Sequence, residues 1–178
     1  MTSPAPKETF SIRAARPDDG EVIVRLIEEL AEYERLRNTC RAEAHTLREH
    51  LFGPKPRAEV LLADRDGEAV GFALFFHTFS TFACAPGLYL EDLYVRPAHR
   101  RLGIGRALLE RVAGIAVARG CRRLEWAVLD WNSPAIDFYR RLGARAMDDW
   151  TVYRMDGPDL LRLARAGARD EENSQNDQ

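Results

Sequence analysis

Two closely spaced glycines join a β-rich segment to a long helical pattern. The junction from His99 to Arg106 reads HRRLGIGR, and it follows the apolar segment Leu88 to Val95. Backbone N–H groups without partners converge at the start of a helix, where the helix dipole is positive. Glycine lets the backbone approach an anion closely. The pattern therefore predicts a strand, a cradle for a diphosphate and a helix, in that order.

Three other interpretations of this glycine pattern are to be compared with the diphosphate cradle. A loop that only joins the strand to the helix is one, because short glycine patterns recur by chance. A P-loop requires Gly-Lys followed by Ser or Thr, whereas Gly105 is followed by Arg106 and Ala107, so that type of nucleotide site is excluded. A dinucleotide fingerprint is closer, because Glu125 lies twenty residues after Gly105, where a ribose-binding acid would stand.

The order of the predicted elements argues against the dinucleotide fold. Apolar residues at i, i+3, i+4 and i+7 predict a first helix, and Asp66-Gly67 is a hairpin turn sequence. Strands are predicted at 10–15, 58–64, 69–79, 88–95, 124–129 and 151–155, and helices from Asp18 or Asp19, at 41–52, after the glycines, and at 133–141. The glycines follow an antiparallel hairpin rather than the first strand of a βαβ series. The sequence therefore predicts a mixed α+β domain.

The length of 178 residues suits one core, without an internal repeat or linker. We expect a flexible tail at residues 1–9, a single domain at 10–166 and a polar, disordered tail at 167–178.

Charge and composition exclude several classes of partner. The formal net charge is −2, so no nucleic-acid footprint or membrane-binding surface is expected. No apolar run approaches the roughly 20 residues of a membrane helix, and the N-terminus has no apolar signal segment. Three widely spaced cysteines fit neither a disulfide framework nor a zinc site. The sequence predicts a cytoplasmic protein without a metal.

Three stretches together resemble the GNAT superfamily of acetyltransferases, and within it the diamine (spermidine/spermine) and thialysine acetyltransferase branch. They are LYLEDLYVRPAHRRLGIG at 88–105, AVLDWN at 127–132 and AIDFYRRLGA at 135–144. The resemblance covers about residues 10–160, and its motifs occur in the order and spacing of the family. Arg101 stands where relatives commonly carry glycine, at a variable position of the pattern.

The resemblance implies a GNAT fold and acetyl-CoA as the cofactor, used as a co-substrate. The central sheet would be mixed, mostly antiparallel, flanked by helices and splayed where the pantetheine arm pairs with exposed backbone. The cradle amides would hold the pyrophosphate, and Tyr139 would point its hydroxyl at the CoA sulfur. The implied cofactor-binding residues are Leu93, Tyr94, Val95, Arg100, Arg101, Leu102, Gly103, Ile104, Gly105, Arg106, Asn132, Ala135 and Tyr139.

Acetyl transfer to an amine requires a neutral amine, a polarised thioester carbonyl and a proton for the departing thiolate. We assign the last task to Tyr139 as general acid, and the carbonyl to backbone N–H groups of strand 93–95. Glu91 would take the proton of the amine, with Asp92 or a water as a possible helper. By residue type alone Tyr139 would be a core aromatic, but its FYxxxG context favours the catalytic role, and the alternative for Glu91 is a surface charge or an acceptor of an N–H group. Adjacent strand residues face opposite ways, so Glu91 and Asp92 are not expected to form a dyad.

The acceptor is expected to be a primary amine of a small molecule. Tyr33 and Glu34 match a substrate-contacting pair of the branch. The alternative is an ordinary solvated helix end with no role in binding. Where polyamine-acetylating relatives read TYDPW, this chain reads TFSTF, so Ser80 replaces an acid. A lysine-like amino acid is therefore as plausible as a diamine or polyamine. The resembled branch commonly forms homodimers, which we expect here too.

Two alternatives from other classes remain. One is a non-catalytic module that binds or senses acyl-CoA, against which Tyr139 and Glu91 argue. The other is a nicotinamide oxidoreductase, which would bind a dinucleotide instead of CoA. Release of a free thiol with a panel of amines distinguishes the enzyme from the sensor.

Overall fold

The computed structural model describes residues 9–176, with side chains for residues 9–167. The predicted flexible tail therefore lies, except for residue 9, outside the described residues. The chain divides into two compact units, one ending at Ala127 and one beginning at Val128. Each unit is described by itself.

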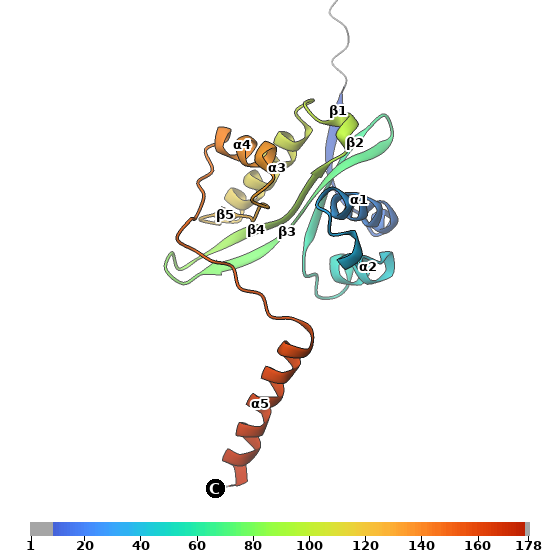
Figure 1. Cartoon of the computed structure of the whole chain (residues 1–178). Helices are drawn as coiled ribbons and strands as arrows, with labels where there is room; N and C mark the ends of the chain where they lie inside the picture. The colour runs from blue at the N-terminus through green and yellow to red at the C-terminus, as the bar shows by residue number, and fades with distance from the viewer. Residues whose placement is uncertain (1–8, 177–178) are drawn as a thin grey trace, which may run out of the picture. The chain divides into compact units, whose positions relative to one another are not determined.

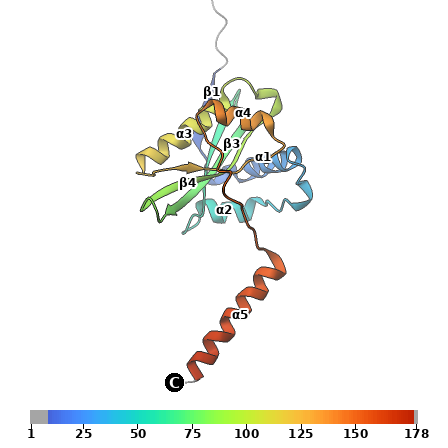
Figure 2. The ribbon, with the colours of Figure 1, turned by 60° about the vertical axis from the view of Figure 1, so that its left-hand side comes forward.

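The first unit is built on a five-stranded sheet. Its strands are β1 (Phe10–Ala14), β2 (Glu59–Arg65), β3 (Glu68–Ser80), β4 (Ala85–Val95) and β5 (Leu124–Glu125). They lie in chain order, and neighbours are antiparallel except β4 and β5, which are parallel. The predicted mixed, mostly antiparallel sheet is confirmed. The last part of β3 pairs only with β4, and the two form a long hairpin (Figure 2).

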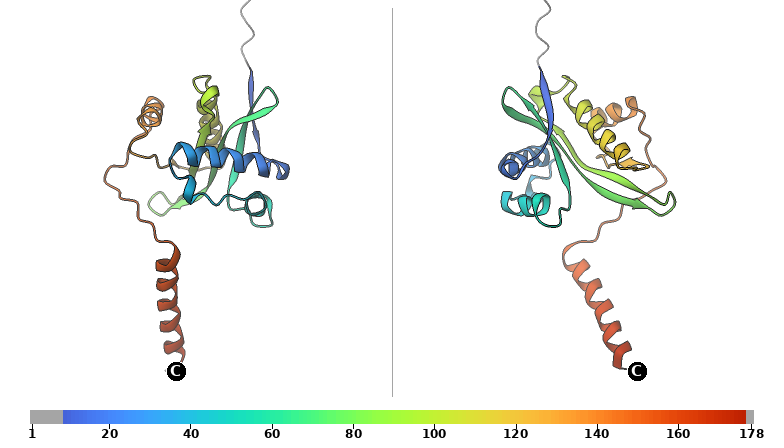
Figure 3. Two further views of the ribbon diagram at one scale, coloured as in Figure 1. Left: turned by 45° about the vertical axis from the view of Figure 1, so that its right-hand side comes forward. Right: turned by 180° about the vertical axis from the view of Figure 1, so that it is seen from behind.

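Helices cover both faces of this sheet. They are α1 (Gly20–Tyr33), α2 (Ala44–Phe52) and α3 (Ile104–Ala118), with short 3₁₀ turns at Pro17–Asp19, Arg37–Thr39 and Pro97–His99. Figures 1 and 3 show α1 and α2 on one face of the sheet and α3 on the other. None of the helices in the described part of the chain is long and apolar enough to cross a membrane.

The core forms where the apolar stripe of each helix meets the sheet. The predicted stripe of α1 is confirmed, because Ile23 and Leu26 are fully buried and Leu30 is nearly so. These residues pack in one cluster with Leu62, Phe72, Leu74 and Tyr94 of the sheet. On the opposite face, α3 contacts β3 and β4 and buries Leu108 and Val112. Burial of this apolar surface from both sides stabilises the sheet.

The β2–β3 turn follows from its two residues. Arg65 pairs with Glu68, which leaves Asp66 and Gly67 as the loop, and their φ angles are 53° and 82°. Positive φ at both central positions defines the hairpin turn that matches the strand twist. The Asp-Gly hairpin predicted from the sequence is therefore confirmed.

The second unit contains two helices, α4 (Ser133–Arg141) and α5 (Gly157–Asn176). Helix α4 has the predicted bounds. The predicted strand at 151–155 is wrong, because this segment has no strand structure and pairs with no strand of the described chain. A β-rich sequence becomes a strand only where another edge accepts its backbone hydrogen bonds. Helix α5 extends over most of the tail that the sequence predicts to be disordered.

Candidate active site

The predicted cradle lies between the end of β4 and the start of α3. A 3₁₀ turn ends at His99, and α3 begins at Ile104 after Gly103, whose φ is 87°. A Cβ atom on Gly103 would meet nothing within 4 Å, so backbone strain rather than space favours glycine here. No side chain caps this end of α3, and its first turn carries no acidic residue. Its free N–H groups can therefore bind an anion such as a diphosphate.

Arg101 adopts a left-handed backbone inside the cradle, with a φ of 66°. This conformation costs an L residue with a side chain roughly 1 kcal/mol or more, whereas glycine adopts it freely. The geometry explains why glycine is common at this position of the motif. It also means that Arg101 lowers the stability of the folded protein.

We expect Arg101→Gly to raise the free energy of unfolding by about 0.5 to 1 kcal/mol, because it removes left-handed strain from an exposed residue. Denaturant titration measures the change. Arg100→Gly is the matched control, since Arg100 has an ordinary extended backbone with a φ of −72°. That control is expected to lower stability, and a fall in stability for Arg101→Gly as well would contradict the strain argument.

The two strands near the cradle pair over only a short length. β4 and β5 pair at Leu88 with Leu124 and at Tyr89 with Glu125, and β5 ends there, short of the predicted 124–129. Beyond Tyr89, β4 pairs with β3 on one side and has no strand partner on its other side within the described chain. Backbone groups on that side, including those of residues 93–95, can accept an extended ligand as an added strand.

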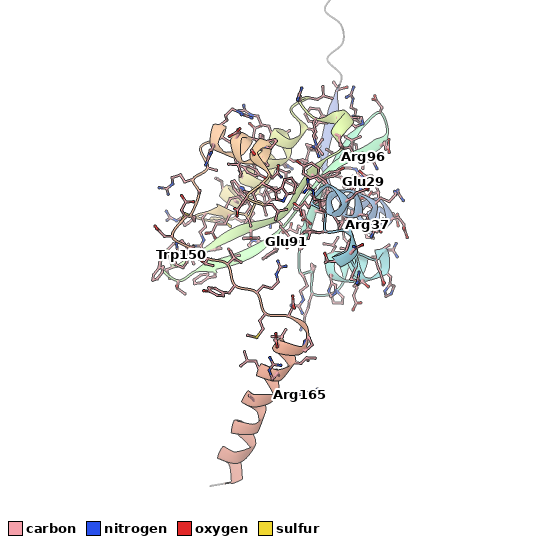
Figure 4. All side chains as sticks on the ribbon, viewed as in Figure 1. Glu29, Arg37, Glu91, Arg96, Trp150 and Arg165 are labelled. Carbon is pink, nitrogen blue, oxygen red and sulfur yellow. The ribbon has the colours of Figure 1, made fainter. Side chains whose placement is uncertain are left out.

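A β-bulge occurs at Glu91. Leu74 pairs with Asp92 and Phe75 pairs with Leu90, so Glu91 is an extra residue on β4. A bulge interrupts the alternation of side chains along a strand. The expectation that Glu91 and Asp92 face strictly opposite ways assumed a regular strand, which the structure does not have here. Glu91, labelled in Figure 4, is exposed, whereas Asp92 is half-buried.

Two other carboxylates act on Asp92 at this bulge. Burial is the main cause that raises the pKa of Asp92 to about 7, and the negative charges of Glu91 and Glu34 raise it further. Glu34 directly follows α1, and burial also raises its pKa. Glu34 and Glu91 therefore both act electrostatically on Asp92, and all three residues are predicted to bind the substrate amine. We name them the carboxyl cluster.

An ion-pair network that was not predicted from the sequence holds α1 against the sheet. Arg96 donates from Nε to Glu29 Oε2 at 2.9 Å and from Nη2 to Glu29 Oε1 at 2.8 Å, and it also pairs with Glu68. Figure 4 shows Arg96 and Glu29 side by side. The negative charge of Glu29 also contributes, after burial, to a raised pKa of Tyr94. No local pattern could reveal a pair that lies 67 residues apart.

Three predicted residues lie in the second unit. Asn132 is buried at the start of α4, and its carbonyl accepts the N–H groups of Ala135 and Ile136, both at 3.0 Å. Tyr139 is half-buried, and its ring centroid lies 5.2 Å from that of Phe138. Asn132, Ala135 and Tyr139 follow the spacing i, i+3 and i+7, so they share one face of the helix.

Ser80 has a structural role at the end of β3. It is 5% exposed, and its Oγ accepts the backbone N–H of Ala83 at 3.2 Å. This bond supports the turn toward β4. An aspartate at this position could accept the same N–H.

The sequence of this chain matches the model of the acetyltransferase (GNAT) family over residues 23–144. It is 38% identical to thialysine N-epsilon-acetyltransferase of Bos taurus, over 86% of this chain and 96% of that protein. It is 31% identical to L-ornithine N5-acetyltransferase of Arabidopsis thaliana, over 91% of each. Among solved structures, an integron cassette protein from the mobile metagenome of V. cholerae matches with a TM-score of 0.74 and 26% identity, over 87% of this chain and 97% of that one.

The matched region includes both the strand, cradle and helix of the first unit and the helix that carries Tyr139. It therefore includes all of the residues that the sequence predicts for the site. From this coverage we conclude that the chain belongs to the GNAT family of acetyltransferases and is an acyl-CoA-dependent N-acetyltransferase.

Proposed function

We propose that this enzyme transfers the acetyl group of acetyl-CoA to a primary amine of a small molecule, either a lysine-like amino acid or a diamine or polyamine. The carboxyl cluster of Glu34, Glu91 and Asp92 carries this proposal. Grouped carboxylates attract a cationic amine and disfavour an anionic acceptor. The relatives named for thialysine and L-ornithine support the same class, because each of these substrates carries an amino group on a short chain.

The cradle and β4 fit the two ends of acetyl-CoA. The uncapped first turn of α3 would bind the pyrophosphate through the amides of residues 101–106. The unpaired side of β4 at Leu93 to Val95 would bind the pantetheine arm, and one of its N–H groups would polarise the thioester carbonyl. Acetyl-CoA supplies an activated acetyl group, which the amine nitrogen takes as the carbon–sulfur bond breaks and CoA leaves as a free thiol.

Proton transfers are assigned to three side chains of the enzyme. Asp92, rather than the Glu91 assigned from the sequence, would accept the amine proton, because a general base works best with a pKa near the operating pH, and burial raises the pKa of Asp92 to about 7. Glu91 would orient the ammonium group beside it. Tyr139 would donate a proton to the departing sulfur, a role that rests on the resemblance of its helix to the family motif.

An amine panel with acetyl-CoA tests the proposed function. Release of the CoA thiol is followed with lysine, thialysine, ornithine, diamines and polyamines, and with a carboxylic acid that lacks an amine as the negative control. We expect release with at least one amine. Binding of CoA without release under any amine would instead support the acyl-CoA sensor.

We also propose that the enzyme acts in the cytoplasm as a homodimer. Free cysteines at Cys40, Cys84 and Cys121 suit a reducing compartment. Large apolar side chains in the second unit are exposed, among them Trp150, Val152 and Tyr153, and an interface could cover them. Sedimentation equilibrium is expected to give twice the mass of the chain, and a monomer at micromolar concentration would contradict the dimer.

A further inference from the structure

Arg100 lies at the start of the cradle, but its guanidinium group also contacts residues outside the cradle. Its Nε donates to the carbonyl of Val95 at 2.9 Å. Its Cζ lies 4.5 Å from the ring centroid of Tyr33 and 5.8 Å from that of Tyr94. A guanidinium within about 6 Å of an aromatic ring makes a favourable cation–π contact. Arg100 therefore joins the cradle to the end of β4 and to the last residue of α1.

Tyr33 is the point at which α1 ends. The next residue, Glu34, closes the helix by donating its N–H to the carbonyl of Leu30 at 2.9 Å, and Arg35 then turns the chain with a φ of 63°. Tyr33 therefore lies in the last turn of α1, directly before the backbone that turns at Glu34 and Arg35. Glu34 in turn interacts with Asp92 through its charge. A contact on Tyr33 is thus one residue from the carboxyl cluster.

The neighbouring arginine shows that this contact is not a general property of the cradle. Arg101 is exposed and makes no ion pair, hydrogen bond or ring contact with any residue whose side chain is described. A cation at the C-terminal end of α1 also suits the negative end of the helix dipole. Position and charge together favour a specific role for Arg100.

We propose that Arg100 is a positioning residue that acts through Tyr33, so that the cradle holds the end of α1 and Glu34 in the place that the amine substrate requires. This inference rests on the proposed function for its consequence in catalysis. Its structural part, that Arg100 orders the end of α1, stands separately. The planar guanidinium is needed, because lysine cannot stack on Tyr33 while donating to Val95 in the same way.

A double-mutant cycle tests the coupling in the intact enzyme. Arg100→Gln and Tyr33→Leu are each expected to raise the KM for the amine about 5-fold, and the double variant is expected to be no worse than either, since they remove one shared contact. Tyr33→Phe keeps the ring and is expected to keep the coupling with Arg100. Additive effects in the cycle would overturn the proposal.

Arg101→Gln is the matched control in the cradle. It removes a neighbouring positive charge but no contact with Tyr33, so we expect weaker CoA binding by calorimetry and, at saturating acetyl-CoA, a smaller rise of the amine KM than in Arg100→Gln. An equal rise of the amine KM in Arg101→Gln and Arg100→Gln would show an effect of charge on the cofactor alone. That result would overturn the positioning role.

Hydrogen exchange gives a readout that needs no catalysis. The amides of Glu34, Arg35 and Leu36 bond to carbonyls of the last turn of α1. In Arg100→Gln these amides are expected to exchange about 5-fold faster, with no such change in Arg101→Gln. Unchanged exchange would overturn the proposal. If no amine is acetylated, the proposed function fails, and the exchange rates still decide whether Arg100 orders α1.

Discussion

Tyr139→Phe is expected to lower kcat for acetyl transfer by about 100-fold or more, because a positioned general acid contributes a factor of about 10² to 10⁴. The variant removes only the hydroxyl group. The ring that lies 5.2 Å from Phe138 is kept, so folding and CoA affinity are expected to stay close to wild type. Steady-state kinetics with saturating acetyl-CoA measure the loss, and calorimetry measures the binding of CoA.

The leaving group provides a sharper test of the acid role. A thioester whose thiol is much more acidic than CoA needs no proton as it departs, so Tyr139→Phe is expected to cost far less with such an acetyl donor. Tyr153→Phe is the matched control, since Tyr153 is 91% exposed in the same unit. Near-full turnover of Tyr139→Phe with acetyl-CoA would contradict the assignment.

Asp92→Asn is expected to lower kcat/KM for the amine by about 100-fold at pH 8, because it removes the proton acceptor. In the wild-type enzyme kcat/KM is expected to rise through pH 7 as Asp92 loses its proton, since its pKa is about 7. The variant is expected to lose this rise. Glu91→Gln removes a negative charge beside Asp92, so it is expected to shift the rise of kcat/KM to lower pH. An unchanged pH profile in Asp92→Asn would contradict the assignment of Asp92 as proton acceptor.

Asp92→Asn is also expected to stabilise the folded protein above pH 7. The pKa of Asp92 rises from 3.8 to about 7 on folding, so the folded state binds more protons between these values and stability falls as pH rises through that window. With allowance for partial exposure, Asp92→Asn should be more stable by about 2 kcal/mol at pH 8. The gain should vanish near pH 4. Denaturant titrations at both pH values measure it, and a pH-independent difference would contradict the burial of a charged Asp92.

These two results would show a site that gives up stability for activity. Burying a carboxyl group beside Glu34 and Glu91 is unfavourable for folding, because like charges and desolvation both oppose ionisation. The same arrangement places a proton acceptor near neutral pH and attracts a cation. Such trade-offs are common where catalytic residues are held in an environment that disfavours them.

Much of the backbone could be predicted because its causes are local. The apolar stripe of α1, the Asp66-Gly67 turn and the bounds of α4 all depend on residues within a few positions of one another. The strand at 151–155 could not be predicted correctly, because a strand depends on an edge supplied by a distant part of the chain. For the same reason β5 is shorter than its apolar sequence suggests.

The cradle was determined by the sequence itself, since Gly103 and the start of α3 dictate where free N–H groups point. The tertiary structure decided what surrounds it. Only folding brings Arg100 onto Tyr33, Glu29 onto Arg96, and Glu34 near Asp92, and only strand pairing creates the bulge at Glu91. Local backbone conformation depends on residues that are neighbours in the sequence, whereas burial and charge at the amine site depend on contacts between segments far apart in the chain.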